Sequence, residues 1–180
     1  MRKLKTTELN RLSVNEFKSA EKIPLVIVLD NVRSRNNVGS IFRTADAFCI
    51  NQIHLCGITD TPPHREIHKT ALGATESVSW KYFQETIDSI RTLKKEGYKI
   101  YAVEQTDEST LLDKIQMTSL NKIALVFGNE INGIDEYVIG ESDGSIEIPQ
   151  FGTKHSLNIS VSAGIVIWEL SRNYFKSVKN

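Results

Sequence analysis

Three polar segments carry the residue types from which a ligand site could be built: DNVRSRNNVG (30–39), GNEING (128–133) and QFGTKHSLN (150–158). Each follows a predicted strand: the first two follow continuous apolar runs, PLVIVL and KIALVF, and the third follows the short strand in SIEIP. Their glycine, asparagine and serine residues can bring backbone N–H groups and small amides close to a ligand. Because ligands of open α/β sheets bind beyond the carboxyl ends of strands, these loops are candidates for one site, although ordinary turns have the same composition.

Single polar residues in and near these segments also have ordinary structural explanations. Arg43 projects from a predicted helix on the side opposite its apolar stripe, where a solvent-exposed arginine is usual. Glu130 could be a carboxylate at a helix N-terminus, and Ser156 could be the N-cap of the last helix. The spacing of these residues alone therefore makes none of them catalytic.

The elements that must position the loops are predicted from apolar runs and helical spacing. Residues 59–69 are predicted to be a loop. Strands that alternate with helices predict an α/β fold, a mainly parallel sheet with helices on both faces. The predicted strands are Pro24–Leu29, Gln52–Cys56, Lys99–Val103, Lys122–Phe127 and Ser145–Ile148. The predicted helices are about Asn37–Cys49, Phe83–Glu96 (with Gly97 as its C-cap) and Ser156–Phe175.

Charge is unevenly distributed along the chain, although its formal sum is zero. Residues 1–43 contain nine Lys or Arg and four Asp or Glu, whereas residues 104–147 contain ten acids and two lysines. Such a polarised surface can present a basic face to the phosphates of a nucleic acid. Solvated charges on helix faces are the structural alternative.

The 180-residue chain is predicted to have a short extension and one domain. Residues 1–22 read as a basic, polar helical extension, with Leu9, Leu12 and Phe17 as possible anchors. No apolar segment of signal-peptide type follows the basic start, and the longest apolar stretch is too short to span a bilayer. We therefore expect neither a secretory signal nor a membrane segment.

The cysteines and histidines exclude two further classes of protein. Cys49 and Cys56 are the only cysteines, which is not a disulfide framework and favours a reduced, cytoplasmic setting. The four histidines have no metal-ligand spacing, so we expect no metal.

Taken together and in order, three motifs resemble the SpoU branch of the SPOUT methyltransferases. They are NNVGSIFRTADAF (Asn36–Phe48), LVFGNEINGI (Leu125–Ile134) and IPQFGTKHSLNISVSAGIVIWEL (Ile148–Leu170). The resemblance covers nearly all of residues 24–175, and ALGATES (71–77) is similar to the family's small-residue loop. One departure is Ile131, which stands where many members have a second glycine.

The resemblance implies a fold and an assembly that periodicity does not show. Residues 23–180 would form a SPOUT methyltransferase domain whose C-terminal part is threaded into a trefoil knot. The knotted loops would form the cofactor site, and two subunits would pack as a homodimer through this region. The last helix is apolar on nearly all faces, which predicts burial, either at this contact or within one subunit.

The resemblance also implies an activity: transfer of a methyl group from S-adenosylmethionine to a ribose 2′-hydroxyl of structural RNA. We favour tRNA as the substrate, with rRNA as the alternative. Arg43 would activate the hydroxyl. Because a guanidinium stays protonated, we interpret this role as stabilisation of the developing alkoxide, with a phosphate held nearby.

Other residues receive roles from the same resemblance and from charge. The residues that would position Arg43 and the substrate are Asn37, Glu130, Ser156 and Asn158. The residues that would hold the cofactor are Gly128, Asn129, Ile148, Leu157 and Asn158. The residues that would contact RNA phosphates are Lys3, Lys5, Arg11, Arg33 and Arg35.

Two other functions fit the sequence less well. A dehydrogenase would need a glycine-rich turn after the first strand, but DNVRSRNNVG contains a single glycine. A non-catalytic RNA-binding module could keep the fold while losing activity, but Arg43, Glu130 and Asn158 are all present.

Overall fold

The three polar loops extend from one parallel β-sheet. This computed structural model describes residues 1–118 and 120–178, and within them the sheet has seven strands in the order β3-β2-β1-β6-β4-β7-β5. Every pair of neighbouring strands is parallel, which confirms the predicted fold class. The strands are β1 (Ile23–Asp30), β2 (Ile50–Cys56), β3 (Ser79–Phe83), β4 (Lys99–Val103), β5 (Thr110–Leu111), β6 (Ile123–Phe127) and β7 (Gly144–Glu147).

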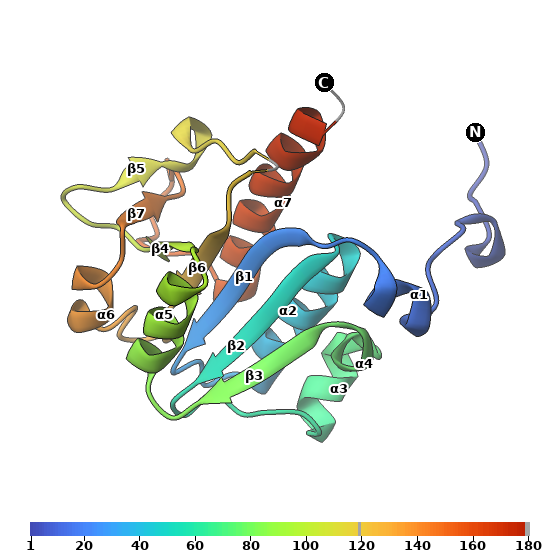
Figure 1. Cartoon of the computed structure of the whole chain (residues 1–180), viewed down its shortest axis with the longest axis horizontal. Helices are drawn as coiled ribbons and strands as arrows, with labels where there is room; N and C mark the ends of the chain where they lie inside the picture. The colour runs from blue at the N-terminus through green and yellow to red at the C-terminus, as the bar shows by residue number, and fades with distance from the viewer. Residues whose placement is uncertain (119, 179–180) are drawn as a thin grey trace.

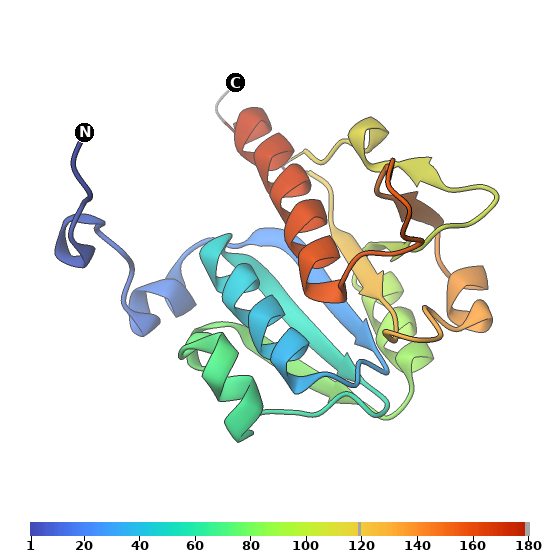
Figure 2. The same ribbon diagram turned by 180° about the vertical axis from the view of Figure 1, so that it is seen from behind.

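Helices cover both faces of the sheet, as Figures 1 and 2 show from opposite sides. The long C-terminal helix lies beside the first long helix on one face, and Figure 2 shows both in front of the sheet. Two 3-10 turns, η1 (Thr6–Glu8) and η2 (Leu112–Lys114), complete the described elements. The α-helices are α1 (Val14–Ser19), α2 (Arg35–Ala47), α3 (Arg65–Ala71), α4 (Ala74–Ser77), α5 (Thr86–Lys95), α6 (Glu136–Gly140) and α7 (Ile159–Val178).

Strand β1 shows how the core is divided between the two faces. Leu25, Ile27 and Leu29 belong to the cluster under α2 and α7, whereas Val26 and Val28 belong to the cluster under α5 and α6. A strand that is buried on both faces has no polar alternation, which is why its sequence is a continuous apolar run. Burial of each such side chain stabilises the fold by about 1.5–3 kcal/mol.

The register between β1 and β6 determines which loops meet. The two strands are neighbours, and Leu29 pairs with Phe127. Because parallel strands end at the same edge of a sheet, the loop after Asp30 and the loop that begins at Gly128 start side by side.

Helix α2 begins two residues earlier than predicted. The Ser34 side chain accepts a hydrogen bond of 3.3 Å from the Asn37 N–H, so Ser34 is the N-cap. The helix ends at Ala47, and Cys49 adopts a positive φ of 53° that turns the chain into β2. Asn37 therefore lies within the first turn of α2 instead of beginning it.

The segment around residues 59–83 contains most of the secondary structure that the sequence pattern missed. Residues 59–69, predicted as a loop, contain the start of α3, and ALGATES contains α4. Phe83, predicted to begin a helix, is instead the last residue of β3. Strand β3 lies at the edge of the sheet with most side chains exposed or half-buried, so it lacks the apolar pattern of a buried strand.

Helix α7 begins at Ile159, three residues later than predicted. Asn158 takes the N-cap position, because its side-chain oxygen accepts a hydrogen bond of 2.9 Å from the Ser160 N–H. Ser156 therefore is not the cap. In this single chain α7 is not buried all round: Ala163 and Val166 pack on the sheet side, whereas Trp168 is exposed.

The N-terminal extension is attached through fewer anchors than predicted. Phe17 on α1 is 5% exposed and packs on the core. Leu9 and Leu12 are 39% and 55% exposed, so the prediction was wrong for these two residues. The knotted path of the chain stays a prediction from the resemblance.

Candidate active site

A chain of side-chain hydrogen bonds joins the three polar loops. The Asn37 amide donates to the Glu130 carboxylate at 3.0 Å, and the Asn158 amide donates to the Asn37 side-chain oxygen at 3.3 Å. These residues come from the first turn of α2, the loop after β6 and the N-cap of α7. Three segments that are distant in sequence thus contribute neighbouring polar groups to one place.

The carboxylate of Glu130 holds the loop after β1 in place. Its two carboxylate oxygens accept hydrogen bonds of 3.0 Å from the backbone N–H groups of Arg33 and Ser34, in addition to the one from Asn37. Partial burial raises the pKa of Glu130, but these donors together outweigh burial, and the pKa lies below its usual value. The carboxylate is therefore ionised and holds the turn that leads into α2.

Asn129 also connects the loop after β6 to the loop after β1. Its amide donates a hydrogen bond of 2.7 Å to the backbone oxygen of Asn31, and its side-chain oxygen accepts from the N–H of Ile131 at 2.9 Å. The adjacent Gly128 approaches the backbone so closely that a Cβ there would lie 2.2 Å from the carbonyl carbon of Gly133. A larger residue at this position would push the loop open.

A cavity of about 720 Å³ lies next to this hydrogen-bond chain. It is formed by the ends of β4, β6 and β7 and by the segment that leads into α7. All five residues predicted to hold a cofactor line it, and so do three of the four predicted positioning residues, one of which, Asn158, belongs to both sets. In chain order these are Gly128, Asn129, Glu130, Ile148, Ser156, Leu157 and Asn158.

The lining of the cavity is acidic and apolar. Its carboxylates are Glu104, Glu130, Glu136 and Glu147, whereas His155 is the one basic side chain among its lining residues. Such a lining attracts a positively charged ligand and repels a polyanion such as a nucleoside triphosphate or a dinucleotide. The cavity is therefore suited to a ligand that combines positive charge with an apolar part.

Arg43 lies on the exposed side of α2, six residues beyond Asn37. Its guanidinium forms no hydrogen bond or ion pair with any residue that the structure describes. It does not line the 720 Å³ cavity. Arg43 is thus held by the helix alone, and its planar donor fork is free for an anionic ligand.

The residues predicted to contact phosphates fall into two groups. Arg35 is engaged within the protein, because its guanidinium forms ion pairs of 2.6 Å with Asp60 and 3.3 Å with Glu66. The other four side chains are exposed and make no hydrogen bond or ion pair within residues 1–118 and 120–178. These are Lys3, Lys5, Arg11 and Arg33.

Sequence reasoning missed a second set of residues that holds the site. Asp30 is 2% exposed and accepts a hydrogen bond of 2.8 Å from the Asn31 amide. Asn31 has a positive φ of 54°, and its side-chain oxygen accepts from the Ile58 N–H at 3.1 Å. The sequence signal for these two residues is an acid followed by asparagine at the end of a buried strand. Asparagine tolerates a positive φ better than most residues.

In the part of the chain that the structure describes, no group of three or more His, Cys, Asp or Glu residues could hold a metal ion. Within the same residues, no helix is both long and apolar enough to cross a bilayer.

The chain is similar to known proteins over most of its length. The chain is 28% identical over 171 residues to a tRNA (guanosine(18)-2′-O)-methyltransferase of Thermus thermophilus, covering 95% of this chain and 86% of the relative. The solved structure of a TrmH/SpoU tRNA modifying enzyme of A. aeolicus has the same fold, with a TM-score of 0.81, 24% identity, and 92% of this chain and 82% of that chain covered.

A second solved structure is that of an AdoMet-bound rRNA methyltransferase of Sinorhizobium meliloti. It matches with a TM-score of 0.77 and 29% identity, and the match covers 84% of this chain and 57% of that chain. The sequence model of the SpoU rRNA Methylase family matches residues 24–168, a range that contains the whole of the site described above. The chain therefore belongs to the SpoU rRNA Methylase family.

Proposed function

We propose that this chain transfers a methyl group from S-adenosylmethionine to a ribose 2′-hydroxyl of structural RNA. The observation that carries the proposal is the junction between the Glu130–Asn37–Asn158 hydrogen-bond chain and the 720 Å³ cavity. The junction places oriented polar groups beside a pocket of suitable size and charge for a cationic cofactor. The name of the T. thermophilus relative supports 2′-O-methylation, and that of the S. meliloti structure supports RNA methylation with this cofactor.

The residues of the cavity fit this cofactor. S-adenosylmethionine has a positively charged sulfonium and an ammonium group, which suit the glutamates of the lining. Its adenine ring needs apolar contacts, which Ile139, Ile148 and Leu157 can supply. We assign cofactor contacts to Gly128, Asn129, Ile148, Leu157 and Asn158.

The protein's own contribution to the reaction is alignment and electrostatics. The bound cofactor supplies an activated methyl group, so the protein needs only to orient the ribose and make its oxygen more nucleophilic. We assign to Arg43 the stabilisation of the negative charge that develops on this oxygen. Asn37, Glu130, Ser156 and Asn158 orient the substrate. Glu130 also fixes the start of α2, the helix that carries Arg43.

The proposed substrate is tRNA, and rRNA is the other outcome of the test. The chain covers 86% of the T. thermophilus tRNA enzyme but 57% of the S. meliloti rRNA enzyme. Lys3, Lys5, Arg11 and Arg33 would contact phosphates, whereas Arg35 would do so only by exchanging its carboxylate partners. We infer that the protein works in the cytoplasm, where it would meet these substrates.

The proposed working form is a homodimer that packs through the C-terminal region. On α7, Ile165, Trp168 and Phe175 are 37%, 54% and 46% exposed, and their spacing places them along one side of the helix. Trp168 also packs against Phe48 of the α2 end, with ring centroids 5.7 Å apart. An apolar stripe of this kind is costly to leave in water and favours contact with a second subunit.

The test is methyl transfer from labelled S-adenosylmethionine to bulk tRNA and, separately, to rRNA, followed by mapping of 2′-O-methylated riboses. The wild-type protein is expected to label tRNA, and the Arg43→Ala variant is expected to bind the cofactor but transfer little. Cofactor binding without transfer to any RNA by the wild type would instead favour a catalytically inactive RNA-binding module.

A further inference from the structure

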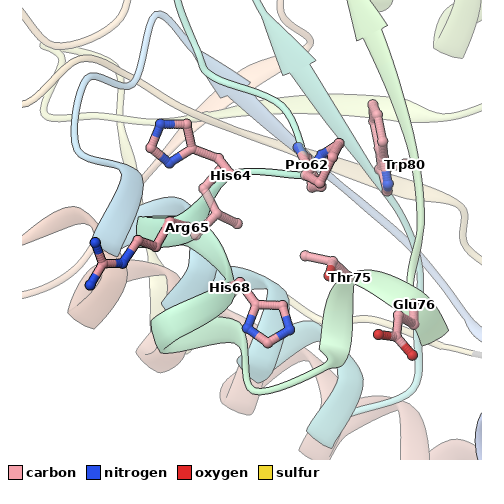
Figure 3. A pocket seen from close by; sticks show the side chains of 9 residues that line it. Pro62, His64, Arg65, His68, Thr75, Glu76 and Trp80 are labelled. Atoms are coloured by element: carbon pink, nitrogen blue, oxygen red, sulfur yellow. The ribbon is translucent and has the colours of Figure 1, made fainter.

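A second pocket, of about 530 Å³, lies between α3, α4 and the edge strand β3. Figure 3 shows Pro62 and Trp80 on one side of its opening, His64 and His68 on the α3 side, and Thr75 and Glu76 on α4. None of these residues belongs to the site described above. The volume falls within the range of roughly 300–1,000 Å³ that is usual for small-molecule sites.

Most of the polar side chains of this pocket have no partner within the protein; the exception is His64, whose Nδ1 accepts a hydrogen bond of 3.2 Å from the Glu66 N–H. The side chains of Arg65, His68, Thr75, Glu76 and Trp80 form no hydrogen bond or ion pair with the residues that the structure describes. Arg65, His68 and Glu76 are exposed, and Thr75 and Trp80 are half-buried, so their polar groups are solvated in the free protein and available to a ligand that enters the pocket.

The chemistry of the lining defines this ligand. Trp80 is half-buried and packs on the core, and it offers an indole ring for stacking and an N–H donor. The Glu76 carboxylate accepts hydrogen bonds, and the Thr75 hydroxyl both donates and accepts. A flat ring with donors and acceptors on its edge, such as a nucleobase, would use all three groups.

Two unpaired cations lie on α3, and one of them, Arg65, lines the pocket. Arg65 and Lys69 stand four residues apart on α3, and neither cation has a carboxylate partner among the described residues. In Figure 3 the Arg65 side chain extends away from Trp80, toward the outside of the pocket. The single acid of α3, Glu66, is already paired with Arg35. A phosphate attached to the base would therefore meet free cations.

Close packing connects this pocket to the helix that carries Arg43. The Thr70 hydroxyl of α3 donates a hydrogen bond of 3.0 Å to the Asn36 carbonyl of α2. A Cβ on Gly39 would lie 2.1 Å from that hydroxyl oxygen and 2.3 Å from the Ile67 carbonyl oxygen. The two helices can approach this closely only because residue 39 is glycine.

We propose that the pocket lined by Trp80, Thr75 and Glu76 binds an unstacked nucleobase of the RNA substrate, with Arg65 and Lys69 on its phosphates. The proposal rests on the proposed function in one respect, namely that the natural ligand is the RNA that is methylated. Stacking of a base on an aromatic side chain tolerates any base and strengthens binding without reading sequence.

The test uses tryptophan fluorescence, since Trp80 and Trp168 are the only tryptophans of the chain. In a Trp168→Phe background, the full chain is titrated with single-stranded hexa-adenylate RNA. Stacking is expected to quench the fluorescence of Trp80 saturably. Tripolyphosphate, which has charge but no base, is expected to cause no quenching. Equal quenching by both probes, or none by the RNA, would overturn the proposal.

Affinity for fluorescein-labelled hexa-adenylate gives an independent measurement. Trp80→Leu keeps an apolar side chain but removes the ring, and it should raise Kd roughly tenfold. Trp80→Phe should restore most of the affinity. Lys81→Ala is the matched control, because this exposed neighbour loses a charge without lining the pocket. An unchanged Kd for a folded Trp80→Leu variant would exclude the pocket as a base site.

Separate measurements distinguish failure of the proposed function from failure of the pocket proposal. Calorimetry with S-adenosylmethionine and methyl transfer to bulk tRNA measure that function without reference to Trp80. If methyl transfer is absent, the proposed reaction fails, while the hexa-adenylate titration still decides whether the pocket binds a base. If methyl transfer is normal and Trp80 does not respond to RNA, only the pocket proposal fails.

Discussion

The side-chain amide of Asn37 donates a hydrogen bond of 3.0 Å to the carboxylate of Glu130, which lies 93 residues further along the chain. The same carboxylate accepts the backbone N–H groups of Arg33 and Ser34. One ionised group therefore ties the loop after β6 to the loop after β1, and it does so at the start of the helix that carries Arg43.

The first prediction concerns the hydrogen bond between Asn37 and Glu130. Glu130→Gln leaves one acceptor oxygen for three donors and removes the negative charge, so kcat for methyl transfer should fall by about 10- to 100-fold, the scale of a charge-assisted hydrogen bond. Combined with Asn37→Ala, the loss should be clearly less than the sum of the two single losses, because both changes break the same contact.

Glu108→Gln is the matched control for this experiment, because Glu108 is exposed and takes no part in the network. It should change kcat less than twofold. Fully additive effects of Glu130→Gln and Asn37→Ala, measured on folded variants, would show that the hydrogen bond between them does not contribute to the reaction.

The second prediction concerns Arg43. Arg43→Ala should lower kcat by roughly 10²–10³, the usual effect of removing one preorganised charge-stabilising group. Arg43→Lys should not restore it, because the planar fork of donors is lost. Lys95→Ala, which removes an exposed cation from α5, serves as the control. Near-normal turnover by a folded Arg43→Ala variant would refute the assigned role.

The third prediction separates two neighbouring arginines. Arg33 has a free guanidinium, whereas Arg35 is held by Asp60 and Glu66. Each phosphate contact releases counterions, so Arg33→Ala should flatten the salt dependence of tRNA binding by roughly one unit of slope. Arg35→Ala should flatten it by clearly less. Salt-titrated binding of bulk tRNA measures both slopes, and equal changes would show that the ion pairs do not occupy Arg35.

The central strands of the fold could be predicted from the sequence because burial on both faces requires apolar side chains. β1 and β6 are buried on both faces and have continuous apolar runs. β3 could not be predicted, because an edge strand with exposed side chains resembles a loop in composition. The helix starts at Ser34 and Asn158 depend on single capping hydrogen bonds that several nearby polar residues could also have made.

The sequence motifs name residues of the candidate site but do not give their arrangement. The motifs named Asn37, Glu130 and Asn158, yet nothing in their spacing shows that Asn37 lies between the other two. That arrangement follows from the strand order, which places the loops after β1 and β6 side by side. The pairing of Arg35 with Asp60 likewise requires knowledge of where the loop after β2 returns.

The fourth prediction concerns assembly through α7. Trp168→Glu places a charge in the exposed apolar stripe, and it should convert the expected dimer into a monomer at micromolar concentration. Lys176→Glu, a charge change on an exposed residue near the end of the same helix, should leave the dimer intact. Sedimentation velocity measures both. A wild-type protein that sediments as a compact monomer at every accessible concentration would refute the proposed dimer.

The last prediction concerns His54, which is 1% exposed within β2. Its ring nitrogens lie 2.7 Å from the Ser89 hydroxyl and 2.9 Å from the Gln52 side-chain oxygen. Burial, with a smaller contribution from the nearby charge of Lys81, lowers the pKa of His54 to about 4. The unfolded chain, in which the pKa of histidine is about 6.5, therefore binds more protons between these two values.

The free energy of unfolding should accordingly fall as the pH drops through this window, since protons favour the state that binds more of them. Between about pH 7 and pH 4.5, the wild type should lose about 2 kcal/mol of unfolding free energy because of His54. A His54→Gln variant should not show this loss. His155→Gln, at an exposed histidine, should behave like the wild type. Urea unfolding at the two pH values measures the difference, and identical pH dependence in wild type and His54→Gln would show that His54 is not held neutral by the fold.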